Sequence, residues 1–548
     1  MTRHLALLLA TAALAGCSMD PRLARPEPPV PPSWPVGDAY LRQSEAALPA
    51  ITYRDIFRDR RLQAIIEQAM ANNRDLRVAV ANIRSARALY RIQRADRFPQ
   101  IDATGNYRYS TGNGSTLNNT GGTGTGTGGT GTGGTGTGGT GTGGTGTGTG
   151  GSTNPGGTGG AGTTVSTGGG GSSFQANIGV TAFEIDLFGR VASLTRAAQQ
   201  RYFAQEAAAR SVRLILVGDI TQAWLTYAAD RSLLRVAEQT AQSAEASVRL
   251  TRARLEGGIV PRSDLTQAQQ ILATAQRDLA EQRTFVAQDV NALTLLVGSG
   301  VDPSLLPASI EEAAPTLAVL PAGLDSRVLL RRPDVVQAEY ELRATNAEIG
   351  AARAALFPRI SLTGILGLAS SSLGGLFSGD AFTASVSPTA SYSIFRAGAA
   401  RANVEFSRAQ RDAALAGYER AIQIAFREVA DALARQGTIA EQLRASQLLL
   451  NATDETLRLN DARYRGGIDT FLTLLDAQRS AYTAQRTFVA TQLTAGINRV
   501  ALYRALGGDA TLETSAQGPL PVTAAGVPRG DQPLPDLPPV PEAPRTRP

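Results

Sequence analysis

Three residues near the end of the chain, Asp469, Leu472 and Asp476, have the types and spacing of a stripe with two carboxylates and one apolar group. Positions i, i+3 and i+7 of a helix lie on one face. Repeated around the axis of a symmetric assembly, such a stripe gives an apolar ring between two carboxylate rings, which favours cations and narrows a mouth. Asp469 also follows a glycine pair, which favours a helix cap as its role. Asp476 lies too far into the expected helix to be a cap.

Most side chains that enzymes use for covalent or metal chemistry are missing. The 548 residues include one cysteine, Cys17, and one histidine, His4, and no lysine, so all 53 basic residues are arginine. Nucleophilic triads, histidine–zinc sites and Schiff bases therefore lack their usual groups. A pair of acidic residues arranged as in glycosidases is the catalytic arrangement that the sequence leaves open. We expect no enzyme, no metal and no cofactor. The net charge of +6 is scattered among acidic residues, which indicates no nucleic-acid partner.

The N-terminus has the pattern of a secretion signal. Arg3 precedes an apolar run that is too short to span a bilayer, and small residues follow up to Cys17. The stretch LAGC, residues 14–17, resembles a bacterial lipobox, which implies removal of the signal peptide 1–16 and acylation of Cys17. Ser18 in place of aspartate implies sorting to the outer membrane. The alternative is an ordinary secretion signal with an incidental cysteine.

The chain contains an internal duplication. Residues 74–105 match residues 333–364, with Asp75 and Asp334 separated by 259 positions. Residues 253–269 match residues 462–478 at an offset of only 209 positions. The Gly/Thr-rich stretch 110–172 accounts for the difference of about fifty residues. We interpret it as an enlarged loop between two strands, whose length costs little because loop-closure entropy grows slowly, with an adhesive or shielding tip as the alternative.

Alternating patterns beside this loop predict two strand pairs. In residues 381–395 apolar side chains alternate with serine and threonine, and weaker alternation predicts the other strands at about 98–109, 174–188 and 357–369. Long strands with an apolar face and a hydroxyl face are typical of a transmembrane barrel. Four strands cannot close one, and open edges are not tolerated in lipid. A dimer would provide eight strands and a packed interior, and a trimer twelve strands and a lumen.

The remaining sequence predicts long helices. Two helical hairpins are expected at 189–297 and 398–506, each with a glycine pair at its tip: Gly257 and Gly258, then Gly466 and Gly467. We divide the chain into a lipidated extended segment (17–58), a first repeat (59–323), a second repeat (324–510) and a Pro-rich tail (511–548) that we expect to be disordered.

The doubled plan resembles the outer membrane efflux family, the TolC-like channels, and in particular the lipidated NodT type of RND drug-efflux systems. The resemblance covers about residues 50–510. The motifs that carry it are LLRRPDVVQAE (329–339), FEIDLFGR (183–190), YSIFRAG (392–398) and ARYRGGIDTFLTLLDAQRS (462–480). It implies an α+β membrane protein: a homotrimer with a twelve-stranded β-barrel in the outer membrane and an α-helical barrel in the periplasm.

The family resemblance also implies partners and roles. A periplasmic adaptor protein and an inner-membrane RND-type pump would dock on the inner end, and drugs or other toxic small molecules would pass through passively to the outside. Leu472 and Asp476 would form the periplasmic gate, and Arg463 and Tyr464 a latch, with Asp264 as a candidate partner. The glycine tips would receive the adaptor, although glycine also ends helices without any such role. The alternatives are an outer channel for type I protein secretion and a lipid-anchored coiled-coil scaffold or adhesin.

Overall fold

The computed structural model describes residues 19–31, 33–35, 40, 52–110, 171–319 and 326–522. The expected signal peptide, Cys17 and nearly all of the Gly/Thr-rich loop lie outside these residues. The chain divides into a helical unit, which contains residues 184–360 together with the chain before 99 and after 389, and a sheet unit of residues 99–183 and 361–389. Within the described residues, no helix combines the length and the apolar character needed to cross a membrane.

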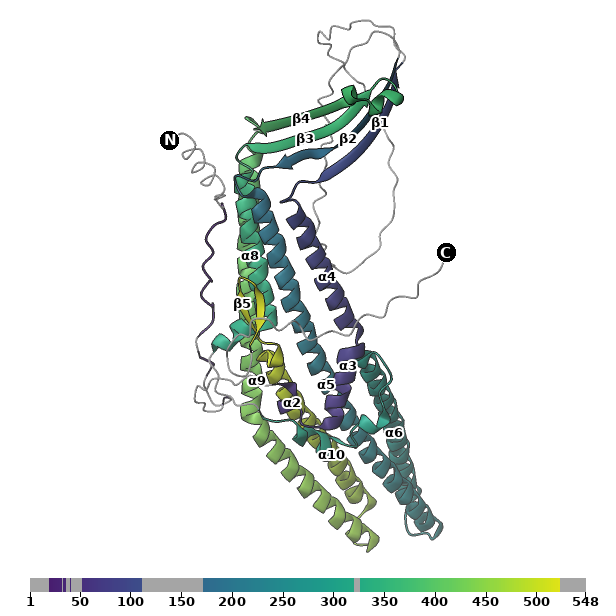
Figure 1. Ribbon diagram of the computed structural model, residues 1–548. Coiled ribbons are helices and arrows are strands. Elements are labelled where there is room, and N and C mark those ends of the chain that lie inside the picture. The colour runs from purple at the N-terminus through teal and green to yellow at the C-terminus, as the bar shows by residue number, and fades with distance from the viewer. Residues whose placement is uncertain are drawn as a thin grey trace, which may run out of the picture. The chain divides into compact units, whose positions relative to one another are not determined.

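The sheet unit contains one four-stranded sheet in the order β1-β2-β3-β4 (Figure 1). Its strands are β1 (Ile101–Ser110), β2 (Gly171–Glu184), β3 (Arg359–Ser370) and β4 (Phe382–Ser391). β1 and β2 are antiparallel, with Ile101 opposite Val180. The centre of the sheet is tightly packed, because a Cβ atom on Gly179 would lie 2.3 Å from the carbonyl oxygen of Gly364. β1 and β4 are the edges of the sheet in a single chain.

Strands β2 and β4 end earlier than their expected limits of 188 and 395. The residues that follow β2 form the turn into the next helix instead. The carboxylate of Asp186 accepts a hydrogen bond from the backbone of Ala192 at 2.7 Å, and Arg190 forms an ion pair with Glu184 at 2.6 Å. The motif FEIDLFGR therefore contains the end of β2, the connecting turn and Arg190, the first residue of α5.

The helical unit consists of long helices and short elements between them. The helices are α2 (Tyr53–Ile56), α3 (Arg60–Asn72), α4 (Arg74–Ala95), α5 (Arg190–Glu256), α6 (Arg262–Val297), α7 (Ile310–Ala313), α8 (Pro333–Ala354), α9 (Ala399–Arg465) and α10 (Phe471–Ala505). Both α5 and α9 contain 67 residues, as a duplicated plan predicts. Each begins after a glycine with positive φ, Gly189 or Gly398, and leads into its return helix, α6 or α10.

The Arg-Arg-Pro-Asp motif has a structural role at the start of α8. Arg332 is buried and donates two hydrogen bonds to the carboxylate of Asp334. The same guanidinium donates to Glu428 of α9 at 2.8 Å and to the carbonyl oxygen of Ala505, the last residue of α10, at 2.9 Å. Pro333 occupies the first turn, where a missing N–H costs nothing. One arginine thus holds three helices of the second repeat together.

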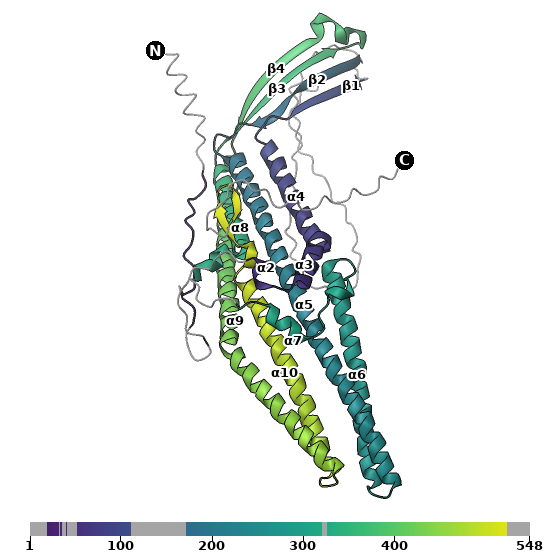
Figure 2. The same ribbon diagram turned by 60° about the horizontal axis from the view of Figure 1, so that its bottom comes forward.

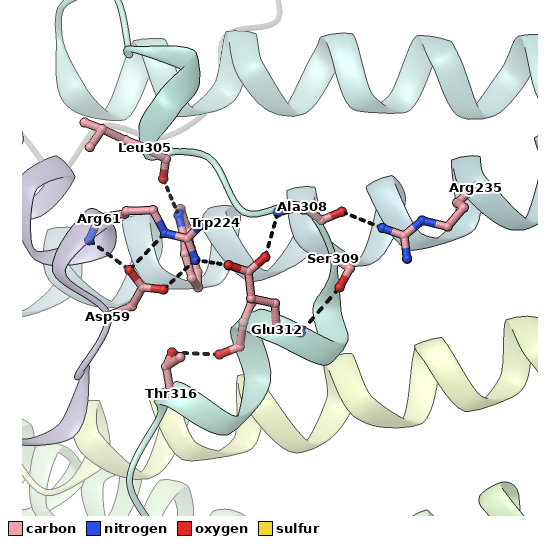
Figure 3. A network of polar contacts seen from close by, with 10 residues as sticks. Asp59, Arg61, Trp224, Arg235, Leu305, Ala308, Ser309, Glu312 and Thr316 are labelled. Carbon is pink, nitrogen blue, oxygen red and sulfur yellow. Dashed lines mark hydrogen bonds and ion pairs between the residues drawn. The ribbon is translucent and has the colours of Figure 1, made fainter.

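A polar network fastens the connection between the repeats (Figure 3). Arg61, in the first turn of α3, pairs with Asp59 at 2.8 Å and with Glu312 of α7 at 2.6 Å. The indole of Trp224 on α5 is fully buried and donates to the carbonyl oxygen of Leu305 at 3.2 Å. These contacts hold the segment after α6 against both α3 and α5.

The prediction of a disordered tail from residue 511 was wrong for its first part. Residues Leu512–Ser515 (β5) and Gly518–Pro521 (β6) form an antiparallel hairpin. Leu512 is fully buried in a cluster with Phe203 of α5 and Tyr340 of α8. The hydroxyl of Tyr340 donates to the carbonyl oxygen of Ser515 at 3.1 Å. The prolines beyond residue 522, which suggested disorder, lie outside the described chain.

Candidate gate at the hairpin tips

The two hairpin tips are built alike. After α5, the N–H of Ile259 donates to the carbonyl oxygen of Arg254 at 2.8 Å, and after α9 the N–H of Ile468 donates to that of Arg463 at 2.9 Å. In each tip the second glycine, Gly258 or Gly467, has a φ of 73°. A side chain there would strain the backbone, which explains one glycine of each pair. Gly257 and Gly466 have ordinary helical φ values and serve as the C-caps.

Arg463 is bound to a residue of its own tip. Its guanidinium contacts the carboxylate of Asp469 at 2.5 and 3.1 Å. The bond from Arg463 holds the pKa of the Asp469 carboxyl below its usual range. Asp264, the expected partner on the other tip, instead accepts from the adjacent Ser263 at 3.3 Å. Within one chain the link from Arg463 therefore closes a tip and does not join two tips.

Asp469, the first of the three residues expected to share one face of the helix, lies outside the helix. α10 begins at Phe471, and its N-cap is Thr470, whose hydroxyl accepts from the backbone of Thr473 at 3.3 Å. Asp469 therefore lies in the turn, and both the helical-stripe and the capping interpretations of that residue were wrong. The threonine that follows it satisfies the helix end because its backbone has the extended conformation that a cap requires.

Leu472 and Asp476 remain on one face of α10. They are separated by four positions, and both side chains are exposed in the single chain. The opposite face, with Phe471, Leu474 and Ala477, is buried. Leu472 is the exposed large apolar side chain of α10, the others on this helix being buried or half-buried, so it is available to meet neighbours or to line an opening.

Tyr464 lies between the two hairpins rather than on their surface. Its side chain is only 4% exposed and belongs to a cluster with Val248 of α5, Ala268 of α6 and Phe471 of α10. The guanidinium carbon of Arg254 lies 4.5 Å from the centroid of the tyrosine ring. Arg254 also donates to the carbonyl oxygens of Tyr464 and Arg465, at 3.4 and 3.3 Å. Arg254 is the residue that connects the tips, and it was not among the residues expected from the sequence.

The duplication contained a signal for Arg254. At the offset of 209 positions Arg254 corresponds to Arg463, and Val260 corresponds to Asp469. The first tip therefore has the arginine of the second without its carboxylate partner. An arginine without a local partner reaches the ring and carbonyl groups of the neighbouring tip instead.

A second link joins the return helices. The hydroxyl of Tyr482 on α10 donates to the carboxylate of Asp278 on α6 at 3.2 Å, and Arg277 pairs with the same carboxylate at 2.5 Å. Burial and the neighbouring carboxylate raise the pKa of the Tyr482 hydroxyl. The hydroxyl therefore stays protonated at neutral pH and remains a donor. Figure 2 shows the two hairpins to which these helices belong.

Comparisons with known proteins agree with this architecture. Residues 65–299 and 324–508 match the family model described as "Outer membrane efflux protein", one match for each repeat. The chain is 40% identical over 513 residues to the "Toluene efflux pump outer membrane protein TtgC" of Pseudomonas putida, covering 93% of this chain and 96% of that protein. It is 37% identical over 508 residues to the "Outer membrane protein OprJ" of Pseudomonas aeruginosa, covering 91% and 95%.

A solved structure gives the same result for the fold. The open state of the outer membrane channel MtrE from Neisseria gonorrhoeae is 30% identical and aligns with a TM-score of 0.73, covering 90% of this chain and 98% of that one. The fold is therefore that of the α+β, TolC-like channels. The chain belongs to the outer membrane efflux protein family. It is an outer-membrane exit duct of an efflux system and not an enzyme, and it works with an adaptor and an inner-membrane pump.

Proposed function

We propose that three copies of this chain form the duct, with twelve strands in one outer-membrane barrel. The observation that carries this proposal is the four-stranded sheet, whose strands β1 and β4 each have one unpaired edge in a single chain. Unpaired backbone groups are not tolerated in lipid, and four strands are too few to close a barrel. Pairing β4 of one copy with β1 of the next removes every edge.

The helical unit supports the same assembly. Ile92 on α4, Phe406 on α9 and Leu448 on α9 are each at least 60% exposed in the single chain. Leu89 is exposed one turn before Ile92, and Leu449 is exposed beside Leu448, so these side chains form groups. Grouped exposed apolar side chains are typical of surfaces that another protein covers. We propose that neighbouring copies cover them and that the helices enclose a periplasmic channel.

The gate lies at the hairpin tips in this proposal. Leu472 and Asp476 form the narrowest ring, and Asp469 lies beside it in the preceding turn. Arg463, Tyr464 and Asp264 act as latch residues. The adaptor docks on the tips around Gly257, Gly258, Gly466 and Gly467. The pump is of the RND type, and Cys17 carries acyl groups that anchor the mature chain in outer-membrane lipid.

The transported compounds are drugs and other toxic small molecules in this proposal. One relative is named for toluene efflux, and the chain described here is similar to it over nearly the whole length of both proteins. Type I protein secretion is the alternative within transport. A lipid-anchored scaffold that displays the Gly/Thr-rich loop is the alternative outside transport, and it requires no pore.

The proposal is tested by imaging and by transport. Protein purified in detergent should form trimers with a hollow axis under the electron microscope and should conduct ions in planar bilayers. Deletion of the gene should increase sensitivity to toluene and antibiotics in cells that express the matching pump and adaptor. Monomers without a pore would contradict the trimeric duct, and lost protein export with unchanged drug sensitivity would favour the secretion channel.

A further inference from the structure

The N-terminal segment lies extended against the helical unit, as the purple trace beside α8 in Figure 1 shows. Arg25 pairs with the buried carboxylate of Glu339 on α8 at 2.7 Å. Trp34 stacks on Phe426 of α9, with ring centroids 5.0 Å apart. Nearer the N-terminus, the side-chain amide of Asn346 on α8 donates to the carbonyl oxygen of Pro21 at 2.8 Å. The segment is thus fixed along its length.

The first fixed side chain, Asp20, sits in a site made for a carboxylate. One oxygen of Asp20 accepts from the hydroxyl of Ser193 at 2.7 Å, and the other accepts from Nε of Arg196 at 2.7 Å. Arg196 also donates to the Ser193 hydroxyl at 3.0 Å, which orients both groups toward Asp20. Both residues lie in the first two turns of α5.

The opposite wall of this site is a glycine. A Cβ atom on Gly350 of α8 would lie 1.8 Å from Oδ1 of Asp20 and 2.9 Å from Oγ of Ser193. Gly350 is in the interior of a helix, where glycine costs about 1 kcal/mol relative to alanine. Its φ is not positive, so backbone conformation does not require a glycine here. The space that it leaves is filled by the carboxylate of Asp20.

We propose that Ser193, Arg196 and Gly350 form a docking site for Asp20 that holds the membrane-anchored N-terminus against the body of the protein. Cys17 precedes Asp20 by three residues and precedes Arg25, the next residue with a side-chain ion pair to the helical unit, by eight residues. At about 3.4 Å per residue, a segment held only from Arg25 onward would let Cys17 reach about 27 Å, whereas one docked at Asp20 reaches about 10 Å. The docking site therefore shortens the connection between Cys17 and the helical unit.

The role as an anchor rests on the proposed acylation of Cys17, but the docking site itself does not. Its occupant is the N-terminal segment of this same chain, and its geometry involves Asp20, α5 and α8 alone. The two claims are therefore separable by experiment.

Trypsin provides the test, because Arg22 lies two residues after Asp20 and the next arginine, Arg25, is protected by Pro26. The full protein in detergent should be cleaved slowly after Arg22. Gly350→Ala blocks the site and Asp20→Asn removes its charge, and each should accelerate this cleavage at least tenfold. The double variant should be no faster than the faster single variant, because both changes break one contact.

The matched control is Gly417→Ala, since Gly417 on α9 has no atom within 4 Å of the position that the new methyl group would take. It should leave cleavage after Arg22 unchanged. Cleavage after Arg465 at the exposed tip serves as a reference for the integrity of the body. Unchanged cleavage after Arg22 in both single variants, or equal acceleration at Arg465, would overturn the proposal.

A further experiment tests the docking site and the acylation of Cys17 separately. The mass of the N-terminal tryptic peptide reports whether Cys17 carries acyl groups. A chain secreted with a leader that is cleaved before Ser18 should keep its resistance after Arg22. Resistance that is seen only in the acylated chain would overturn the docking site, whereas an unmodified Cys17 in a resistant chain would overturn only the lipid anchor.

Discussion

The guanidinium of Arg254 lies 4.5 Å from the centre of the Tyr464 ring, so the first hairpin of the chain holds the second hairpin at its tip. Tyr464 is buried there, and Arg254 also donates to two backbone carbonyl oxygens of α9. Any outward movement of α9 and α10 away from the first hairpin has to break these contacts.

Replacing Arg254 is expected to favour the open state of the tips. A cation–π contact contributes about 0.5–2 kcal/mol, so Arg254→Ala should change the ratio of open to closed tips in each protomer by roughly two- to thirtyfold. The measurement is channel conductance in planar bilayers. Arg252→Ala is the control, since this neighbour is exposed and should have no effect. Equal conductance of the Arg254 variant and wild type would argue against this link.

Asp476→Ala is expected to raise single-channel conductance and to reduce the preference for cations. The proposed ring loses three carboxylates and becomes wider in the assembled trimer. Arg463→Ala should raise conductance less, because its exposed pair with Asp469 lies within one tip and such pairs contribute little. A variant channel with wild-type conductance and selectivity would place Asp476 away from the narrowest ring.

Much of this architecture could be predicted because the chain repeats itself. The glycine pairs at the tips and the equal lengths of α5 and α9 follow from one plan used twice. Aligning the two repeats also shows where they differ: the first repeat has Val260 at the position that Asp469 occupies in the second. The consequence of that difference, the contact of Arg254 with Tyr464, depends on the distance between two hairpins. The spacing within one hairpin contains no information about it.

The C-terminal end of the chain was predicted least well, for a physical reason. Proline-rich sequences lack the periodic apolar pattern from which elements are predicted. The hairpin β5–β6 exists because Leu512 inserts between α5 and α8, and Tyr340 binds its backbone. Such order comes from the surface on which a segment lies, and not from the segment itself.

Arg332→Ala is expected to destabilise the helical unit by about 2–3 kcal/mol. It leaves Asp334, Glu428 and the carbonyl oxygen of Ala505 without their shared donor, and removing one member of a buried ion pair is costly. The two carboxylates are partly exposed, which keeps the loss at the lower end. The measurement is the midpoint of denaturant unfolding. Arg331→Ala, an exposed neighbour, is the control, and equal midpoints of the two variants would contradict the clamp.

Two facing carboxyl groups of the first hairpin predict a dependence of stability on pH. Burial and a hydrogen bond to Asp230 of α5 raise the pKa of the Asp289 carboxyl on α6 to about 7. In the unfolded chain the same group has a pKa of about 3.9. The folded state therefore binds more protons between these values, so its stability is full below about pH 4 and falls as pH rises through 7.

Asp289→Asn should remove this dependence, and the duplication supports the choice of residue. At the offset of 209 positions Asp289 corresponds to Asn498, whose amide donates to the carbonyl oxygen of Ala432 at 3.0 Å. The second repeat thus tolerates the neutral amide at the same place. The variant should unfold at a higher temperature than wild type at pH 8 and at nearly the same temperature at about pH 3.5, below the unfolded pKa, both measured at one scan rate. A difference between variant and wild type that is equal at both pH values would show that the two carboxyl groups do not share a proton.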